Sequence, residues 1–184
     1  MSILVTGLII FFLIHAVPMF PAMKGGVKSR LGENGYKGLF SVISLLSLGL
    51  IIWGKSVAPF EPVWQEPLLP RTVSYLLVLM AFILLPAANM PTNIKRFTRH
   101  PMLWGIVCWA LAHLNVNGDK ASILLFGGFL VYSIVAMISS NARGATYSQQ
   151  VQPVKKDIVV VVAGITVYAV VFYFHGSLFG YPLG

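Results

Sequence analysis

Charged residues and cysteine are both scarce in this 184-residue chain. Only 10% of its residues are charged and 57% are hydrophobic, whereas a soluble domain has about 25% charged residues. So few polar side chains cannot cover a globule exposed to water. The single cysteine, Cys108, excludes an internal disulfide framework and any multi-cysteine zinc or iron–sulfur site.

Several apolar runs approach the roughly 20 residues that cross the hydrocarbon core of a bilayer. They predict an all-α integral membrane protein, a bundle of about six transmembrane helices that forms one domain over residues 1–184. The first run is not followed by an A-x-A-like cleavage site, so we expect a retained helix and not a removed signal peptide. The predicted spans are residues 2–20, 36–53, 71–88, 101–116, 120–139 and 157–175.

Lysine and arginine are distributed unequally between the two sets of connections. Three lie on one side: Lys55, Arg71 and Lys120. Ten lie on the other: Lys24, Lys28, Arg30, Lys37, Lys95, Arg96, Arg99, Arg143, Lys155 and Lys156. Because cytoplasmic loops carry the excess of basic residues, both termini are expected to face away from the cytoplasm. The net charge of +8 then reflects topology and attraction to anionic lipid, which argues against a nucleic-acid partner.

Acidic residues are absent from the interior of the predicted spans, which disfavours a carboxylate proton relay or a hard-cation site. The ionisable residues well inside are His15 and His113. Two membrane histidines without a carboxylate suit the axial ligation of a haem, although each ring could instead hydrogen-bond a neighbouring helix. His100 lies at the start of the fourth span. His100 and His113 both differ from His15 by about 10 Å in depth along the membrane normal, so depth does not decide which of them would be the second ligand beside His15.

A basic pair, Arg99 and His100, precedes Pro101, which suits the first turn of a helix. The pair would anchor the chain at the lipid head groups or bind an anionic group at the helix N-terminus. Cys108 lies about 140° around the helix from His113 and is expected to behave as a small buried hydrophobe. His175, at the outer end of the last span, is expected to be dispensable.

Longer motifs resemble the NnrU family of bacterial inner-membrane proteins, which is named for a link to nitrite and nitric oxide reductase expression, hence to denitrification. The matching stretches are His15 to Pro18, Arg30-Leu31-Gly32-Glu33, Tyr36-Lys37-Gly38-Leu39-Phe40, Phe97 to Gly105, Trp109-Ala110-Leu111-Ala112-His113-Leu114, Asn117-Gly118-Asp119 and Leu124 to Phe129. They cover most of the chain. The resemblance implies a multi-pass protein of the bacterial inner membrane. With the orientation expected from the basic residues, both termini would then be periplasmic.

Plant zeta-carotene isomerase is similar to this family, and its b-type haem is held by two membrane histidines at positions that match His15 and His113. The resemblance thus implies haem b as cofactor, with these two residues as metal ligands, and it does not make His100 an axial ligand. Trp109, Arg99 and His100 are kept as further candidate cofactor-binding residues. One departure is Ala110, where the isomerase has a cysteine implicated in ligand exchange.

Three roles are compatible with such a site. The protein is a haem-dependent cis-trans isomerase of a polyene lipid, a haem-dependent accessory or sensor that meets nitric oxide, or a structural membrane protein without cofactor. Besides membrane lipids and haem, the expected partner is therefore a lipid-soluble polyene or nitric oxide. Arg-His-Pro with Gly105 four residues after the proline also resembles S-adenosylmethionine-dependent membrane methyltransferases of the isoprenylcysteine type. Those carry an acidic pair that residues 141–147 here do not supply.

Overall fold

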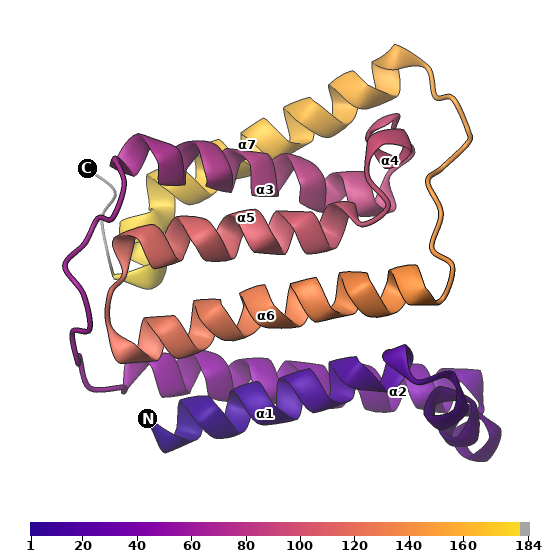
Figure 1. Cartoon of the computed structure of the whole chain (residues 1–184), viewed down its shortest axis with the longest axis horizontal. Helices are drawn as coiled ribbons and strands as arrows, with labels where there is room; N and C mark the ends of the chain where they lie inside the picture. Colours follow the sequence, from indigo (N-terminus) through magenta and orange to yellow (C-terminus); the bar gives the residue numbers. More distant parts are fainter. Residues whose placement is uncertain (181–184) are drawn as a thin grey trace.

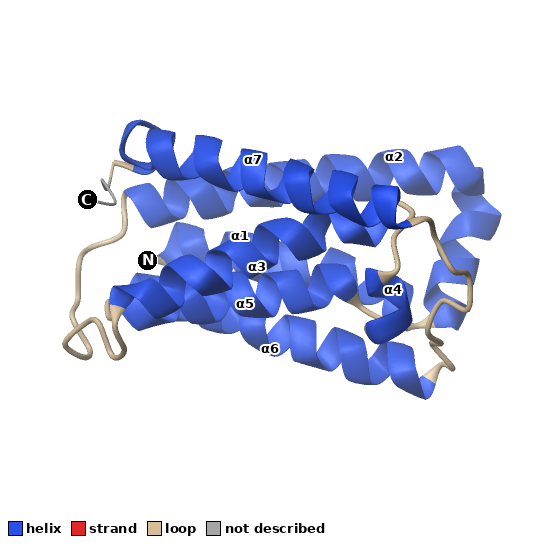
Figure 2. Ribbon diagram, turned by 90° about the horizontal axis from the view of Figure 1, so that it is seen from above, coloured by secondary structure: helices blue, strands red, loops and turns tan. Residues whose placement is uncertain are grey.

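Helices make up almost all of the computed structural model, which describes residues 1–180 (Figures 1 and 2). The elements in chain order are α1 (Ser2–Ala16), the 3₁₀ turn η1 (Val17–Met19), α2 (Pro21–Ser56), α3 (Arg71–Asn89), α4 (Ile94–Phe97), α5 (Pro101–Val116), α6 (Lys120–Ala142) and α7 (Val154–Phe179). The described residues contain no strand, only an isolated β-bridge between Pro62 and Asp119. The prediction of an all-α membrane bundle is confirmed.

Five helical stretches are long and apolar enough to cross a membrane: residues 2–19, α2, α3, α6 and α7. The sixth helix of the bundle, α5, has 16 residues and is about 24 Å long, short of the roughly 30 Å hydrocarbon core. It packs between α3 and α6, and Gly105, Val107, Cys108, Ala110 and Ala112 on it are buried. Because protein surrounds much of α5, its length need not match the bilayer. The chain is a multi-pass membrane protein.

The long helices pack side by side in the order α2, α1, α6, α5, α3, α7. In Figure 1 the pair α1 and α2 lies at the bottom, α6 and α5 run through the middle, and α3 and α7 lie at the top. The order differs from that of the chain because α1 and α6 pack together, although more than 100 residues separate them. This contact brings the first helix next to the centre of the bundle.

Helix α2 differs from the prediction at its start. We expected the second span to begin at about residue 36, and the structure extends the helix back to Pro21. At Gly32 the backbone has φ 72° and ψ 172°, a conformation that breaks the regular helix and that glycine adopts without steric cost. The residues before Gly32 therefore form a separate helical arm, seen end-on at the right of Figure 1.

The two ends of the bundle have different chemistry. All ten basic residues that were assigned to one side by their connections lie where α1, α3 and α6 end and where α2, α5 and α7 begin. We call this the basic end. Met1, the connection 57–70, the turn 117–119 and the end of α7 lie at the opposite end (Figure 1). An even number of passes thus puts the first residue and the last described helix turn on one side.

Hydrogen bonds at the opposite end hold the last turn of α5 against the connection 57–70. The buried Asn115 side chain accepts from the Leu69 amide (2.6 Å) and donates to the Leu69 carbonyl (3.0 Å) and to Ser74 Oγ (2.9 Å). Sequence patterns did not single out Asn115, because its partners are far away in the chain.

Asp119 caps α6 beside this network. It accepts from the Ser122 amide (3.0 Å) and forms an ion pair with Lys55 (3.1 Å). Burial alone would raise the pKa of the Asp119 carboxyl, but the hydrogen bonds from Ser122 and the charge of Lys55 hold this pKa below its usual value. Asp119 therefore stays ionised and connects α2, through Lys55, with α6.

Candidate functional site

His113 lies on α5, just over one turn after the middle of the helix, with its ring among aromatic side chains. Its Nδ1 donates to the Trp109 carbonyl one turn earlier (2.8 Å). The ring stacks on Phe126 of α6, with centroids 4.5 Å apart, and lies 5.1 Å from the Trp109 ring. The imidazole is partly buried. The rings beside it, Phe126 and Trp109, are aromatic and uncharged.

His15 lies in the last turn of α1 in a similar environment. Its Nδ1 donates to the Phe11 carbonyl (2.8 Å), and its ring stacks on Phe11 with centroids 3.9 Å apart. Phe40 of α2 meets it edge-on at 5.0 Å. Tyr132 of α6 donates its hydroxyl to the His15 carbonyl (3.1 Å). Side chains from three helices therefore fix the position of this ring.

The two histidines share one hydrogen-bond pattern with a chemical consequence. A backbone carbonyl only accepts, so the proton of each neutral ring must sit on Nδ1, which leaves the Nε2 lone pair as the atom able to bind a metal. A hydrogen bond from the second ring nitrogen to a backbone carbonyl is how metal-ligating histidines are commonly oriented. Both His15 and His113 are thus held in a tautomer that leaves Nε2 free to bind a metal.

The rings also lean toward one another along the bundle. Side chains of a helix tilt toward its N-terminus, as the bonds to residues four positions earlier show for both histidines. Since α1 runs toward the basic end and α5 runs away from it (Figure 1), the two tilts point in opposite directions. On α6 the partner of His113 is Phe126 and that of His15 is Tyr132, six residues apart, which separates the two backbones by about 9 Å in depth.

Phe129 of α6 joins the two environments. Its ring lies 5.2 Å from Phe11, which stacks on His15, and 5.7 Å from Trp109, which lies beside His113. His15, His113 and Trp109 therefore belong to one aromatic cluster formed by α1, α5 and α6. The structure brings together three of the five residues that the sequence nominated for cofactor binding.

A buried hydroxyl without a partner lies near this cluster. Ser133 of α6 is fully buried, and its Oγ has no hydrogen-bond partner among the described residues. At 100° per residue it is on the same face of α6 as Phe126, about two turns toward the basic end. It can donate to a polar edge of a bound group. Two imidazole rings, aromatic side chains and a spare hydroxyl donor are groups that could hold a haem.

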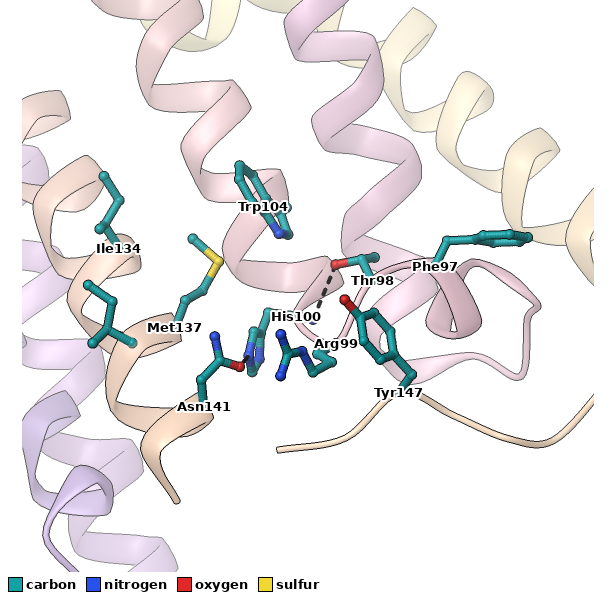
Figure 3. Close-up of a pocket in the computed structure, with 10 residues that line it drawn as sticks. Phe97, Thr98, Arg99, His100, Trp104, Ile134, Met137, Asn141 and Tyr147 are labelled. Atoms are coloured by element: carbon teal, nitrogen blue, oxygen red, sulfur yellow. Dashed lines mark hydrogen bonds between the residues drawn. The ribbon is translucent and has the colours of Figure 1, made fainter. Parts of the chain in front are cut away.

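Arg99 and His100 lie elsewhere. His100 is 13 residues before His113 on α5, about 20 Å away along the helix. Together with Arg99 it lines a pocket of about 490 Å³ at the basic end, and neither His15 nor His113 lines this pocket (Figure 3). None of the lining residues is acidic, whereas the methyltransferase resemblance calls for an acidic pair.

Two other residues considered in the sequence have now been placed. Cys108 is buried, and Ala110, at the position of the isomerase cysteine, is fully buried in the core between α5, α1 and α6. His175 of α7 lies 4.9 Å from the Phe179 ring. Among the described residues no group of three or more His, Cys, Asp or Glu side chains could hold a bare metal ion.

Six apolar helices around a cluster that holds two oriented histidines define a polytopic membrane protein with a candidate cofactor site. The comparison with known families agrees with this class. The family described as NnrU protein matches residues 3–183, and the chain therefore belongs to the NnrU family. No curated protein and no solved structure matches the chain.

Proposed function

We propose that this protein is a b-type haem protein of the bacterial inner membrane, with His15 and His113 as axial ligands and both termini periplasmic. One observation carries the proposal: both rings donate from Nδ1 to the carbonyl four residues earlier and keep Nε2 for a metal. Their location on two helices that flank α6 supports a cofactor inserted between α1 and α5. The excess of basic residues at one end supports the orientation.

A bound haem would supply redox chemistry and the binding of diatomic gases. The chain would orient the ligands and exclude water. His113 belongs to α5, which protein surrounds and which Asn115 fixes at the end near the ligand. His15 belongs to the last turn of α1, where the helix gives way to η1. We infer that His15 is the more easily displaced ligand.

A site that opens by losing one histidine suits a nitric-oxide-responsive accessory protein or sensor in nitrogen-oxide respiration. This role is the one we propose. Ala110 offers no thiolate to capture an opened site, so closure would depend on the return of His15. An isomerase of a polyene lipid would use the same ligands, and activity on such a substrate is the outcome that would replace the proposed role.

The ligands are tested by the absorption spectrum of the detergent-purified protein. We expect a Soret band in the wild type and its loss or strong shift in His15→Ala and His113→Ala. His100→Ala is a matched control, because it removes the histidine directly before α5 and outside the aromatic cluster, and it should keep the band. His175→Ala is a second control, because it removes the histidine of α7. Loss of the band in His175→Ala, with His15→Ala harmless, would move the second ligand to α7 and contradict our pair.

The openable site is tested by adding carbon monoxide or nitric oxide to the reduced protein. A prompt spectral shift is expected, and it should be faster or larger in His15→Ala that has been given imidazole as a replaceable ligand. A haem spectrum that neither gas changes would contradict a sensing role and would leave electron transfer as the better explanation.

A further inference from the structure

The pocket at the basic end has a polar half and an apolar half. Arg99, His100, Asn141 and Tyr147 line it at the end of the bundle, and Trp104 with residues of α6 lines it deeper along the helices (Figure 3). His100 Nε2 donates to Asn141 Oδ1 (2.9 Å), which joins the start of α5 to the end of α6. The pocket volume of about 490 Å³ is within the range of small-molecule sites.

The apolar half is a stripe on one face of α6. Ile134, Met137 and Ile138 follow the i, i+3, i+4 spacing of a single helix face, and Asn141 at i+7 joins this face to the polar half. From Asn141 to Ile134 the stripe runs about 10 Å toward the middle of the bundle. Ile138 is 63% exposed and Trp104 is 46% exposed, so the stripe is open on the side that faces the acyl chains of the membrane.

The polar half is positively charged. Arg99 lies with its guanidinium 4.8 Å above the Tyr147 ring and donates to the Ala145 carbonyl at a long 3.4 Å. No carboxylate lines the pocket to neutralise this charge. Pro101 begins α5 directly after His100, and the free amides of a helix N-terminus add partial positive charge. The arrangement favours an anion at the level of the lipid head groups.

We propose that this pocket binds one anionic phospholipid from the leaflet at the basic end, with its phosphate at Arg99 and one acyl chain along Ile138 and Ile134. A neutral or zwitterionic lipid would leave the guanidinium without a matching net charge, and a free phosphate would leave the apolar stripe uncovered. The site is independent of the haem site, since His100 is about 20 Å from His113 along α5 and neither iron ligand lines the pocket. Lipid bound here would hold α5, α6 and residues 143–147 together.

Lipid retention by the detergent-purified protein, measured by native mass spectrometry during titration, tests the proposal. Phosphatidylglycerol should be retained as one molecule per protein with at least about tenfold preference over phosphatidylcholine. Arg99→Gln should weaken this retention by about tenfold, since it removes a charged hydrogen-bond donor. Arg96→Gln is the matched control, because it removes the same charge from the same end of the bundle outside the pocket, and it should retain the lipid normally.

A second pair of variants tests the apolar half without touching Arg99. Ile138→Trp fills the exposed groove and should lower retention of phosphatidylglycerol, whereas Val135→Trp places the same ring on an exposed position of α6 outside the pocket and should not. The melting temperature of each variant, followed by labelling of the buried Cys108 during heating, serves as the check that the variant is folded. Equal retention by Arg99→Gln and Arg96→Gln, or equal retention of the two lipids, would overturn the proposal. Binding of inorganic phosphate in place of the lipid would assign the pocket to a soluble anion and overturn it as well.

Discussion

Replacing Gly54 with alanine should destabilise the protein through the contact between α1 and α2. A Cβ built on Gly54 would lie 2.5 Å from Leu4 Cα and 2.9 Å from the Ile3 carbonyl carbon. These are backbone atoms, which a rotamer change cannot move away. Gly7 repeats the contact on the opposite helix, where a Cβ would meet the Ile51 amide nitrogen at 2.8 Å. Small residues at such positions let membrane helices approach closely.

The magnitude follows from the distances. Ordinary contact begins at 3.4 Å, and the Leu4 amide nitrogen would be even closer than Leu4 Cα at 2.5 Å. The two helices must therefore separate by at least about 0.9 Å. A gap of that size costs each neighbouring contact a quarter to a half of its dispersion energy. Leu4 is completely buried there. Overpacking of a tight core costs about 1–3 kcal/mol, which corresponds to a fall in Tm of roughly 2–4 °C per kcal/mol for a chain of this size.

The single cysteine provides the assay. Cys108 is 8% exposed, so a thiol-reactive fluorophore labels it upon unfolding, and the fluorescence during heating reports Tm. Gly49→Ala is the matched control in the same helix, because a Cβ at Gly49 meets nothing within 4 Å. It should be neutral or stabilise by up to about 1 kcal/mol through helix propensity. If the Tm of Gly54→Ala is as high as that of Gly49→Ala and neither is below the wild-type Tm, the close packing of α1 on α2 is refuted.

Three further predictions concern the ends of the bundle. Asn115→Ala should lower the free energy of unfolding by about 1–3 kcal/mol, because it removes three hydrogen bonds and leaves the Leu69 amide unpaired; the same thiol assay measures it, and an unchanged Tm would contradict it. The stabilising contribution of Asp119, whose pKa is lower in the folded protein, is complete at neutral pH and should be lost as the pH falls below about 4; in melting curves against pH, Asp119→Asn should be less stable at pH 7 and should lose less stability on acidification. Reporter fusions at Glu33 and Gln149 should be active only with a cytoplasmic reporter, and a periplasmic signal from either would contradict the orientation derived from the basic residues.

Apolar runs, prolines and basic residues were enough to predict which segments of this chain cross the membrane, without tertiary information. A span such as 101–116 was predicted to the residue, because apolar length and Pro101 act locally and α5 begins at that proline. The helical arm before Gly32 was not predicted. Its glycines and lysines resemble a loop, and only the positive φ at Gly32 shows where one helix ends and the next begins.

Residue type singled out His15 and His113, because an ionisable side chain inside a membrane helix is conspicuous in any sequence. Trp109 was added only with the resemblance to the NnrU family. Only tertiary structure placed them in one cluster, since α6 joins two helices that are about 100 residues apart in the chain. The tertiary structure also separated Arg99 and His100 from that cluster, because they precede the first turn of α5 whereas His113 lies near its last turn. The partners of Asn115 and the close contact of Gly54 with Leu4 could not be read from the sequence either. Such contacts depend on helix register and approach, which the packing of the whole bundle decides.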